Sequence, residues 1–487
     1  MSLQLNAPTL LCQQAFVAGE WVHADNGATV AVTNPATGGQ IGTVPVCGAA
    51  ETRRAIEAAE AARHAWAARP AKERSAVLRR LNDLLLANQD DLGLIMTSEQ
   101  GKPLAEAKGE IAYAASFIEW FADEARRVYG DTIPAPLADR RILALKQPIG
   151  VTAAITPWNF PTAMLTRKAG PALAAGCSMV VKPATQTPFS ALAFALLAER
   201  AGVPKGLLSV ITGASGEIGG EMTANPLVRK LTFTGSTEVG RTLMRQSADT
   251  IKKLSLELGG NAPFIVFDDA DLDAAVDGAM VSKYRNTGQT CVCANRIYVQ
   301  KGVLDAFTAK LVAKVEALKV GNGVEPGVTQ GPLIDAKAVA KIEEHVADAI
   351  AKGGKVLTGG KRHALGGQFY EPTVVAGATA DMLVAHEETF GPLAPIFAFD
   401  TEAEVIARAN DTEFGLAAYF YSRDIGRVMR VAERLESGMV GVNTGLISTA
   451  EAPFGGVKQS GLGREGSRYG LEEFLEIKYV CLAGLDA

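Results

Sequence analysis

The sequence predicts an α/β fold with an open, mostly parallel sheet, divided into more than one domain. From Val151 onward, short apolar or β-branched runs alternate with turns and helical segments, and repeated βα units of this size form parallel sheets. The chain has 487 residues, whereas single hydrophobic cores usually stop growing near ~250–300 residues. Hydrophobic residues make up 48% and charged residues 21%, which is the balance of a globular protein with an ample core. We therefore expect two or three domains.

The first 128 residues show a mostly helical pattern. Residues 49–68 are rich in Ala, Glu and Arg, with apolar residues at helical spacing. Residues 73–103 repeat this pattern, and Gly101 and Pro103 mark the end of the helix. Residues 132–150 consist of two proline-bounded pieces of alternating character, which predict an extended hairpin.

The strands expected after this hairpin fall into two series. Each is a short β-branched or apolar run, and helical segments such as 188–202 separate those of the first series. The first series comprises 151–156, 178–183, 207–212 and 230–235, and the second comprises 262–267, 296–300 and 436–443. This order predicts one parallel sheet for each series.

Composition excludes several classes of function. The net charge is −5, from 48 basic and 53 acidic residues without a basic run, which argues against a nucleic-acid partner. No apolar run is long enough to cross a bilayer, and the first fourteen residues do not have the pattern of a signal peptide. Six cysteines in a chain of this length are typical of cytosolic thiols. We expect a soluble, cytoplasmic protein without a membrane partner.

The stretch GQTCVCAN, residues 288–295, raises the question of what Cys291 and Cys293 do. The C-x-C spacing differs from the C-x₂₋₄-C of zinc sites, and the five histidines are scattered. We therefore expect no metal site.

Two glycine-rich turns are candidate nucleotide sites. One has Gly213, Gly216 and Gly219, and the other places Gly235 and Ser236 between a strand and a helix. Amides at a helix N-terminus suit a phosphate group, but most such turns only connect elements. Lys182 follows a strand at the edge where open α/β sheets bind ligands, although it could equally be an ordinary exposed lysine.

Four segments together resemble the NAD(P)-dependent aldehyde dehydrogenase superfamily. They are TPWNFP (156–161), LELGGNAPFIVF (256–267), GQTCVCAN (288–295) and EETFGP (387–392). The resemblance covers essentially the whole chain and is strongest to succinate-semialdehyde dehydrogenases. It implies a Rossmann-type cofactor domain, an α/β catalytic domain and a small β oligomerisation element.

The resemblance implies a covalent mechanism. Cys291 would attack the aldehyde and hold the acyl group as a thioester. Asn159 would stabilise the oxyanion, and Glu257 would act as the general base for deacylation. Each of these residues taken alone could instead be structural.

The resemblance also implies a nicotinamide dinucleotide cofactor. The positions that match cofactor contacts are Trp158, Lys182, Thr185, Gly235, Ser236, Glu388 and Phe390. Many NAD-preferring members have glutamate where this chain has Thr185. A glutamate would repel a 2′-phosphate, whereas threonine can donate to it and Lys182 can neutralise it. We therefore expect NADP, with NAD possible.

The resemblance indicates the substrate through three polar positions. Arg167, Arg285 and Ser448 match a pocket for the distal carboxylate of succinate semialdehyde, and arginine binds carboxylates bidentately. Glutarate semialdehyde is the alternative substrate, because pockets discriminate one methylene by only ~1–3 kcal/mol. A broader-specificity aldehyde dehydrogenase, a Cys-dependent hydrolase or acyltransferase, and a catalytically silent cofactor-binding protein are further alternatives.

The resemblance implies the domain boundaries and the assembly. Residues 1–128 and 149–257 would form the cofactor domain, and 258–460 the catalytic domain. Residues 129–148 and 461–487 would form the oligomerisation element of a homodimer or homotetramer.

Cys293 could be a small packing residue. It could instead be a redox partner that forms a strained, easily reduced disulfide with Cys291.

Overall fold

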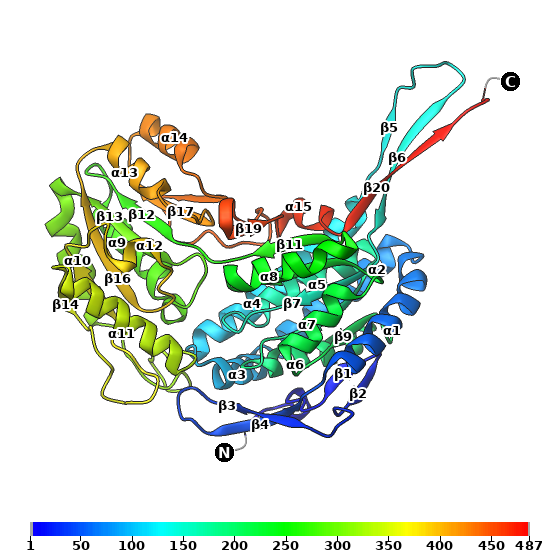
Figure 1. Cartoon of the computed structure of the whole chain (residues 1–487), viewed down its shortest axis with the longest axis horizontal. Helices are drawn as coiled ribbons and strands as arrows, with labels where there is room; N and C mark the ends of the chain where they lie inside the picture. Colours follow the sequence, from blue (N-terminus) through cyan, green and yellow to red (C-terminus); the bar gives the residue numbers. More distant parts are fainter. Residues whose placement is uncertain (1–2, 486–487) are drawn as a thin grey trace.

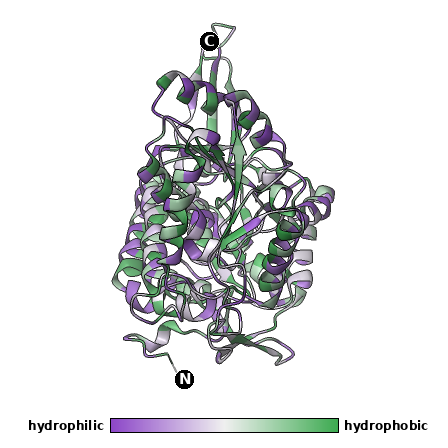
Figure 2. Ribbon diagram, turned by 90° about the vertical axis from the view of Figure 1, so that its left-hand side faces the viewer, coloured by the Kyte–Doolittle hydropathy of each residue, from purple (hydrophilic) through white to green (hydrophobic). Residues whose placement is uncertain are grey.

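The computed structural model describes residues 3–485. Residues 1–2 and 486–487, which fall in the predicted ranges 1–128 and 461–487, lie outside the described residues. Two large sheets, each covered by helices, form two lobes, and a small sheet projects away from both (Figure 1). In Figure 2 the helices change between hydrophobic and hydrophilic colouring along their length, as helices packed on a core by one face do. No helix within residues 3–485 is long and apolar enough to span a membrane.

The first large sheet has eight strands in the order β19-β11-β10-β7-β8-β9-β1-β2. Its five central strands are parallel, and they are β7 (Val151–Ile155), β8 (Ser178–Lys182), β9 (Leu208–Val210), β10 (Val228–Thr234) and β11 (Lys253–Glu257). The antiparallel strands at its edges are β1 (Ala15–Val17), β2 (Glu20–Val22) and β19 (Gly461–Leu462). Its helices are α1 (Ala49–Ala67), α5 (Ala163–Ala175), α6 (Pro188–Ala201), α7 (Ser215–Ala224) and α8 (Thr237–Ser247). The first predicted strand series is thus confirmed.

Short strands near the N-terminus are absent from the sequence prediction, which expects mostly helix there. They are β1 and β2, together with a separate pair made of β3 (Thr29–Thr33) and β4 (Gln40–Pro45). Strands of three residues are too short to show a period, and β1 is fixed by pairing with β9 at the sheet edge.

The predicted helix at 73–100 is two helices. They are α2 (Ala71–Ala87) and α3 (Gln89–Gln100), and α4 (Leu104–Glu124) follows them. Asn88 breaks the pattern because its side chain donates to the carbonyl of Leu84 at 2.8 Å and so ends α2. The predicted end at Gly101 is confirmed. Its φ is +98°, and a Cβ there would lie 2.7 Å from Pro332.

The second large sheet has seven strands in the order β14-β15-β16-β13-β12-β17-β18. They are β12 (Ala262–Val266), β13 (Ala294–Gln300), β14 (Lys355–Thr358), β15 (Thr373–Ala376), β16 (Leu393–Phe399), β17 (Ala417–Tyr421) and β18 (Met439–Val442). Only β14 is antiparallel to its neighbour. The helices of this lobe are α9 (Leu272–Tyr284), α10 (Leu304–Glu316), α11 (Ala336–Ala351), α12 (Leu383–His386), α13 (Glu402–Asn410) and α14 (Ile425–Arg434). The three strands of the second predicted series correspond to β12, β13 and β18 and are confirmed, whereas β14, β15, β16 and β17 are absent from the sequence prediction.

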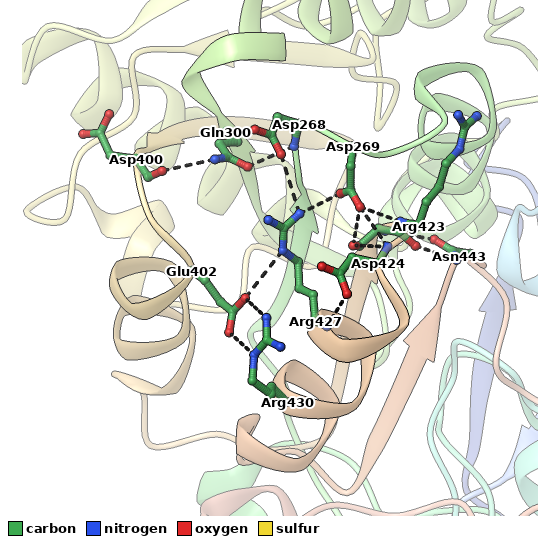
Figure 3. A network of polar contacts seen from close by, with 11 residues as sticks. Asp268, Asp269, Gln300, Asp400, Glu402, Arg423, Asp424, Arg427, Arg430 and Asn443 are labelled. Carbon is green, nitrogen blue, oxygen red and sulfur yellow. Dashed lines mark hydrogen bonds and ion pairs between the residues drawn. The ribbon is translucent and has the colours of Figure 1, made fainter.

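A polar network fixes the edge of this sheet where β12 and β17 end (Figure 3). One carboxylate oxygen of Asp269 accepts from Ser422 Oγ at 2.9 Å and from the backbone N–H of Arg423 at 2.8 Å. The other accepts from Arg427 at 2.8 Å. Since its charges are satisfied within the cluster, we assign the network a structural role.

The small sheet consists of β20 (Leu475–Leu482), which follows α15 (Ser467–Glu472), and of β6 (Arg141–Pro148) and β5 (Asp131–Ile133), which form the predicted hairpin. It extends into solvent at the upper right of Figure 1. Apolar side chains on it are exposed, notably Ile477 at 74% and Tyr479 at 65%. The strands agree with the expected hairpin, and the domain boundaries stay a prediction.

Short 3₁₀ helices complete the described chain. They are η1 (Pro8–Leu10), η2 (Ala125–Arg127), η3 (Ala248–Thr250), η4 (Arg285–Gly288), η5 (Lys301–Val303) and η6 (Lys458–Ser460).

Candidate active site

A cavity of about 220 Å³ is lined by residues that end or follow strands of the first large sheet and by residues that precede β13 and β16 of the second. Eight of the residues singled out in the sequence line it, namely Trp158, Asn159, Gly235, Ser236, Glu257, Cys291, Glu388 and Phe390. Parallel strands end at a common edge, so segments far apart in the chain meet there.

The candidate nucleophile follows an unusual turn. Asn286 and Thr287 have φ values of +52° and +55°, and Gly288 follows at +74°. Gly288 is required because a Cβ would lie 2.1 Å from the carbonyl oxygen of Gly391. Burial raises the pKa of Cys291 to about 12, although Arg167 acts to lower it. The thiol therefore holds its proton until a reaction removes it.

Asn159 follows β7 and is 5% exposed. Its amide nitrogen donates to the carbonyl of Gln289 at 3.0 Å. An amide nitrogen carries two hydrogens, so the second can donate to a ligand in the cavity.

Glu257 ends β11 and is 4% exposed. Neither carboxyl oxygen has a hydrogen-bond partner within the described residues. Burial raises its pKa well above the usual range, and the Glu465 carboxylate raises it further. Burial of a carboxyl group without a hydrogen-bond partner favours its protonated form over the carboxylate.

A charged cluster behind Glu257 is absent from the sequence prediction. Glu465 accepts from Lys168 Nζ, and its Oε2 lies 3.0 Å from Arg167 Nε. These two cations hold the pKa of Glu465 below its usual value in spite of burial. Lys168 also donates to Thr234 at 2.6 Å. Residues separated by 297 positions give no local signal, so sequence reasoning could not bring them together.

Arg167 lies inside this cluster, and neither of the two cavities described here includes it in its lining. It is 1% exposed, and its guanidinium lies 3.7 Å from the ring centroid of Phe454. Its Nη2 has no hydrogen-bond partner in the described part of the chain, which leaves a donor for a ligand.

Lys182 and Thr185 lie at the carboxyl end of β8, beside β7. Lys182 is 4% exposed and donates to Thr185 Oγ1 at 3.4 Å, and within residues 3–485 it has no ion pair. Burial lowers its pKa to about 8. A buried ammonium without a counter-ion, at this edge of a parallel sheet, fits an anionic group.

The remaining candidate cofactor residues surround the cavity from both sheets. Ser236 caps α8, where its Oγ accepts from Val239 N at 3.4 Å. Glu388 accepts from Gly260 N at 3.2 Å, and burial raises its pKa to about 7. The rings of Trp158 and Phe390 meet edge to face, with 5.5 Å between centroids. The helix N-terminus, the aromatic pair and the acidic acceptor together fit a dinucleotide. The Gly213 turn is absent from the lining.

A second cavity of about 290 Å³ is lined by Arg285, Ser448, Phe160, Tyr113 and Lys102, among others. The Arg285 guanidinium lies 5.3 Å from the ring centroid of Phe160 and forms no hydrogen bond or ion pair with any other described side chain. A half-buried cation of this kind suits an anionic ligand group.

Cys293 lies two residues after Cys291 and is 6% exposed. Its Sγ donates to the carbonyl of Lys283 at 3.1 Å, and burial raises its pKa. Both sulfurs are free thiols. This geometry suits packing, and the redox pairing stays a prediction.

Known proteins are similar to this chain over nearly its whole length. Residues 21–480 match the aldehyde dehydrogenase family. A glutarate-semialdehyde dehydrogenase of Pseudomonas aeruginosa is 70% identical over 483 residues, covering 99% of this chain and 100% of that protein. The succinate-semialdehyde dehydrogenase (NADP⁺) GabD of Escherichia coli is 65% identical over 99% of this chain and 100% of its own. The solved structure of a succinate-semialdehyde dehydrogenase from Burkholderia pseudomallei has 68% identity and a TM-score of 0.98, covering 99% of this chain and 100% of that one.

Proposed function

The chain belongs to the aldehyde dehydrogenase family of oxidoreductases, and we propose that it oxidises succinate semialdehyde to succinate with reduction of NADP. The observation that supports this proposal most is that Cys291, Asn159 and Glu257, from three distant segments, line one cavity. They are the nucleophile, the oxyanion donor and the base that such a reaction needs.

Acylation begins at Cys291. Its sulfur bonds to the aldehyde carbon as the S–H proton passes to water, and the electrons of the carbonyl π bond move to the oxygen, which becomes an oxyanion. Asn159 Nδ2 donates to that oxyanion together with the backbone N–H of Cys291. A nicotinamide held beside Trp158, Glu388 and Phe390 would supply the hydride acceptor, and Cys291 would keep the acyl group as a thioester.

Deacylation depends on Glu257. As a carboxylate it takes a proton from water, the resulting hydroxide bonds to the thioester carbon, and the C–S bond breaks to release succinate and the thiol. The raised pKa of Glu257 makes it a strong base once ionised, because a higher pKa means tighter proton binding.

The preference for NADP rests on Lys182 and Thr185. We propose that Lys182 neutralises the 2′-phosphate and that Thr185 donates to it, with the 3.4 Å contact between them as support. Lys182 has no carboxylate partner in the described chain, so its charge is available to a phosphate group.

The substrate carboxylate is assigned to the second cavity. Arg285 would bind it with Ser448 at the cavity wall, whereas Arg167 lies outside the lining of both cavities and its contact with the carboxylate stays a prediction. Glutarate semialdehyde is the second candidate, because the relative at 70% identity carries that name.

Initial rates with purified protein test this function. Succinate semialdehyde, glutarate semialdehyde, butanal and pentanal should be compared with NADP and with NAD as the cofactor. We expect the highest kcat/KM for succinate semialdehyde with NADP, and a large loss for the uncharged aldehydes. A higher kcat/KM for glutarate semialdehyde would make that aldehyde the substrate. Equal kcat/KM for charged and uncharged aldehydes would contradict the assignment of a carboxylate pocket.

A further inference from the structure

Asn286 forms a buried hydrogen-bond network between the nucleophile loop and the turn that carries Asn159. Its side-chain Nδ2 donates to the carbonyl of Asn159 at 3.0 Å and to the carbonyl of Gln289 at 3.1 Å. Its Oδ1 accepts from Gln100 Nε2 at 3.0 Å. Asn286 and Gln100 are both 0% exposed. Both hydrogens and the oxygen of the amide are therefore used in contacts that water does not reach.

These contacts involve both the backbone and the side chain of Asn159. Asn286 binds the backbone carbonyl of Asn159 directly. It also binds Gln289 O, which is the atom that accepts from the Asn159 side-chain amide at 3.0 Å. Asn286 thus contacts both the backbone of Asn159, whose carbonyl also accepts from Lys102 at 2.7 Å, and the acceptor that orients the Asn159 side chain. The direction of the second Asn159 amide hydrogen follows from these two constraints.

The backbone of Asn286 adds a separate constraint. Its φ is +52°, a conformation that asparagine and glycine tolerate better than other residues. Its N–H donates to Glu106 Oε2 at 2.8 Å. A glycine at this position keeps the backbone and removes only the amide side chain, so the two contributions can be separated.

We propose that Asn286 is a positioning residue for the oxyanion site, acting through Asn159 and Gln289. This inference rests on the proposed function, in which Asn159 stabilises the oxyanion formed at Cys291. Positioning errors of about 1 Å can cost about 10²-fold in rate.

Two reagents that do not require the cofactor separate positioning from general support of the loop. Iodoacetamide alkylates a thiol by displacing iodide and forms no oxyanion, whereas 4-nitrophenyl acetate acylates the thiol through a tetrahedral oxyanion and releases 4-nitrophenolate. For Asn286→Gly we expect acylation of Cys291 to slow by about tenfold to a hundredfold, with alkylation unchanged. The steady-state oxidation should lose kcat with little change in KM.

Further variants test whether misfolding of Asn286→Gly could explain its slower acylation. Asn286→Asp keeps the shape and the tolerance of positive φ but places carboxylate oxygens against two carbonyls, and it should show the same pattern. Gln100→Met removes the partner of Oδ1 from outside the loop and should show a weaker form of the pattern. Asn410→Gly is the matched control, because the Asn410 amide also bonds to backbone groups of a distant segment, the carbonyl of Arg434 and the N–H of Glu436. It should leave both rates unchanged.

A double-mutant comparison closes the test. In an Asn159→Ala background, Asn286→Gly should add little further loss, since the two residues act as one unit. Wild-type acylation rates in Asn286→Gly and Asn286→Asp, or an equal fall in acylation and alkylation, would overturn the positioning role alone. An Asn159→Ala variant that still acylates at the wild-type rate would instead overturn the oxyanion role of Asn159, and the role of Asn286 with it.

Discussion

Arg285 and Arg167 have different surroundings, although the sequence predicts one role for both. Arg285 lines the second cavity without an ion-pair partner among the described residues, and Arg167 contacts Glu465 in the cluster behind Glu257. Arginine is well suited to either setting, because its planar guanidinium binds carboxylates of a substrate or of the protein. The two substitutions should therefore have different consequences.

Arg285→Ala should reduce kcat/KM for succinate semialdehyde far more than for butanal. Losing a charge-assisted pair costs about 2–5 kcal/mol when the remaining charge is buried. Arg167→Ala should reduce the rate on both aldehydes, because it also removes a cation that holds Glu465 ionised. Kinetics on the two substrates check this, with Arg127→Ala, an exposed partner of Glu124, as the control. Equal losses on both substrates in Arg285→Ala would mean that it supports the fold.

Thr185→Glu should shift the cofactor preference toward NAD. A glutamate at this exposed position would repel a 2′-phosphate. It would also pair with Lys182 and neutralise its charge. The ratio of kcat/KM for NADP over NAD measures the shift, and Gln186→Glu, its exposed neighbour, is the control. An unchanged ratio in Thr185→Glu would show that Thr185 does not face the ribose.

At the level of elements, Glu99 joins α3 to the start of α6. Its carboxyl accepts from the backbone N–H groups of Phe189 and Ser190, each at 2.8 Å. Burial nevertheless raises the pKa of Glu99 to about 8, because no cation lies close enough to offset the lost hydration. A carboxyl whose pKa is raised on folding stabilises the protein while it is protonated, and that stability is lost as pH rises through the raised pKa.

Glu99→Gln should therefore flatten the pH dependence of stability. Glutamine does not titrate, but its NH₂ group faces one backbone N–H that the carboxyl accepts from, so the variant should lie below the wild type near pH ~5 and lose less stability as the pH rises to ~8. One pKa unit corresponds to about 1.4 kcal/mol, so the difference can reach a few kcal/mol. Thermal unfolding across this pH range measures it, with the exposed Glu119→Gln as the control. A difference in Tm between wild type and Glu99→Gln that stays constant with pH would contradict the assignment.

Many elements with a clear local pattern could be predicted, although β3, β16 and β17 are β-branched or apolar runs that the sequence prediction also left out. Elements fixed by tertiary contacts could not be predicted. The strands β7, β8, β10, β12 and β13 are apolar runs followed by turns, and the structure confirms them. The strands β1 and β2 have three residues each and depend on pairing at a sheet edge. The break at Asn88 depends on a side-chain bond that competes with the helix.

The site follows the same division. The motif residues could be named from the resemblance, and eight of them line one cavity. Glu465 and Asn286 could not be named, because their partners lie far away in the sequence: Lys168 for Glu465, and Gln100 and Asn159 for Asn286. Buried networks of this kind are set by the packing of several elements and leave no local pattern.

At the scale of the whole molecule, the projecting sheet is the surface that we propose for self-association. Ile477 and Tyr479 are two positions apart on β20, so they share one face of the strand, and both are exposed. An apolar strand face is usually covered in a stable assembly. Charged side chains on this strand face would oppose its burial against another subunit.

Ile477→Lys combined with Tyr479→Lys should reduce the assembly toward the monomer, since burying two ammonium groups is unfavourable. Sedimentation velocity measures the mass in solution. The exposed Lys478→Ala, between them on the other face of the strand, is the control and should keep the wild-type mass. An unchanged mass in the double variant would move the interface elsewhere.

The covalent role of Cys291 is the central claim, and Glu257→Gln offers the most direct test of it. Without the base, acylation should proceed once and the thioester should persist. After mixing with NADP and succinate semialdehyde, we expect one burst of NADPH per active site, followed by slow turnover. Mass spectrometry should find one succinyl group on the peptide that contains Cys291, and Cys291→Ser in the same background should abolish both signals. An unmodified Cys291 after the burst, or a burst that survives Cys291→Ser, would contradict the account.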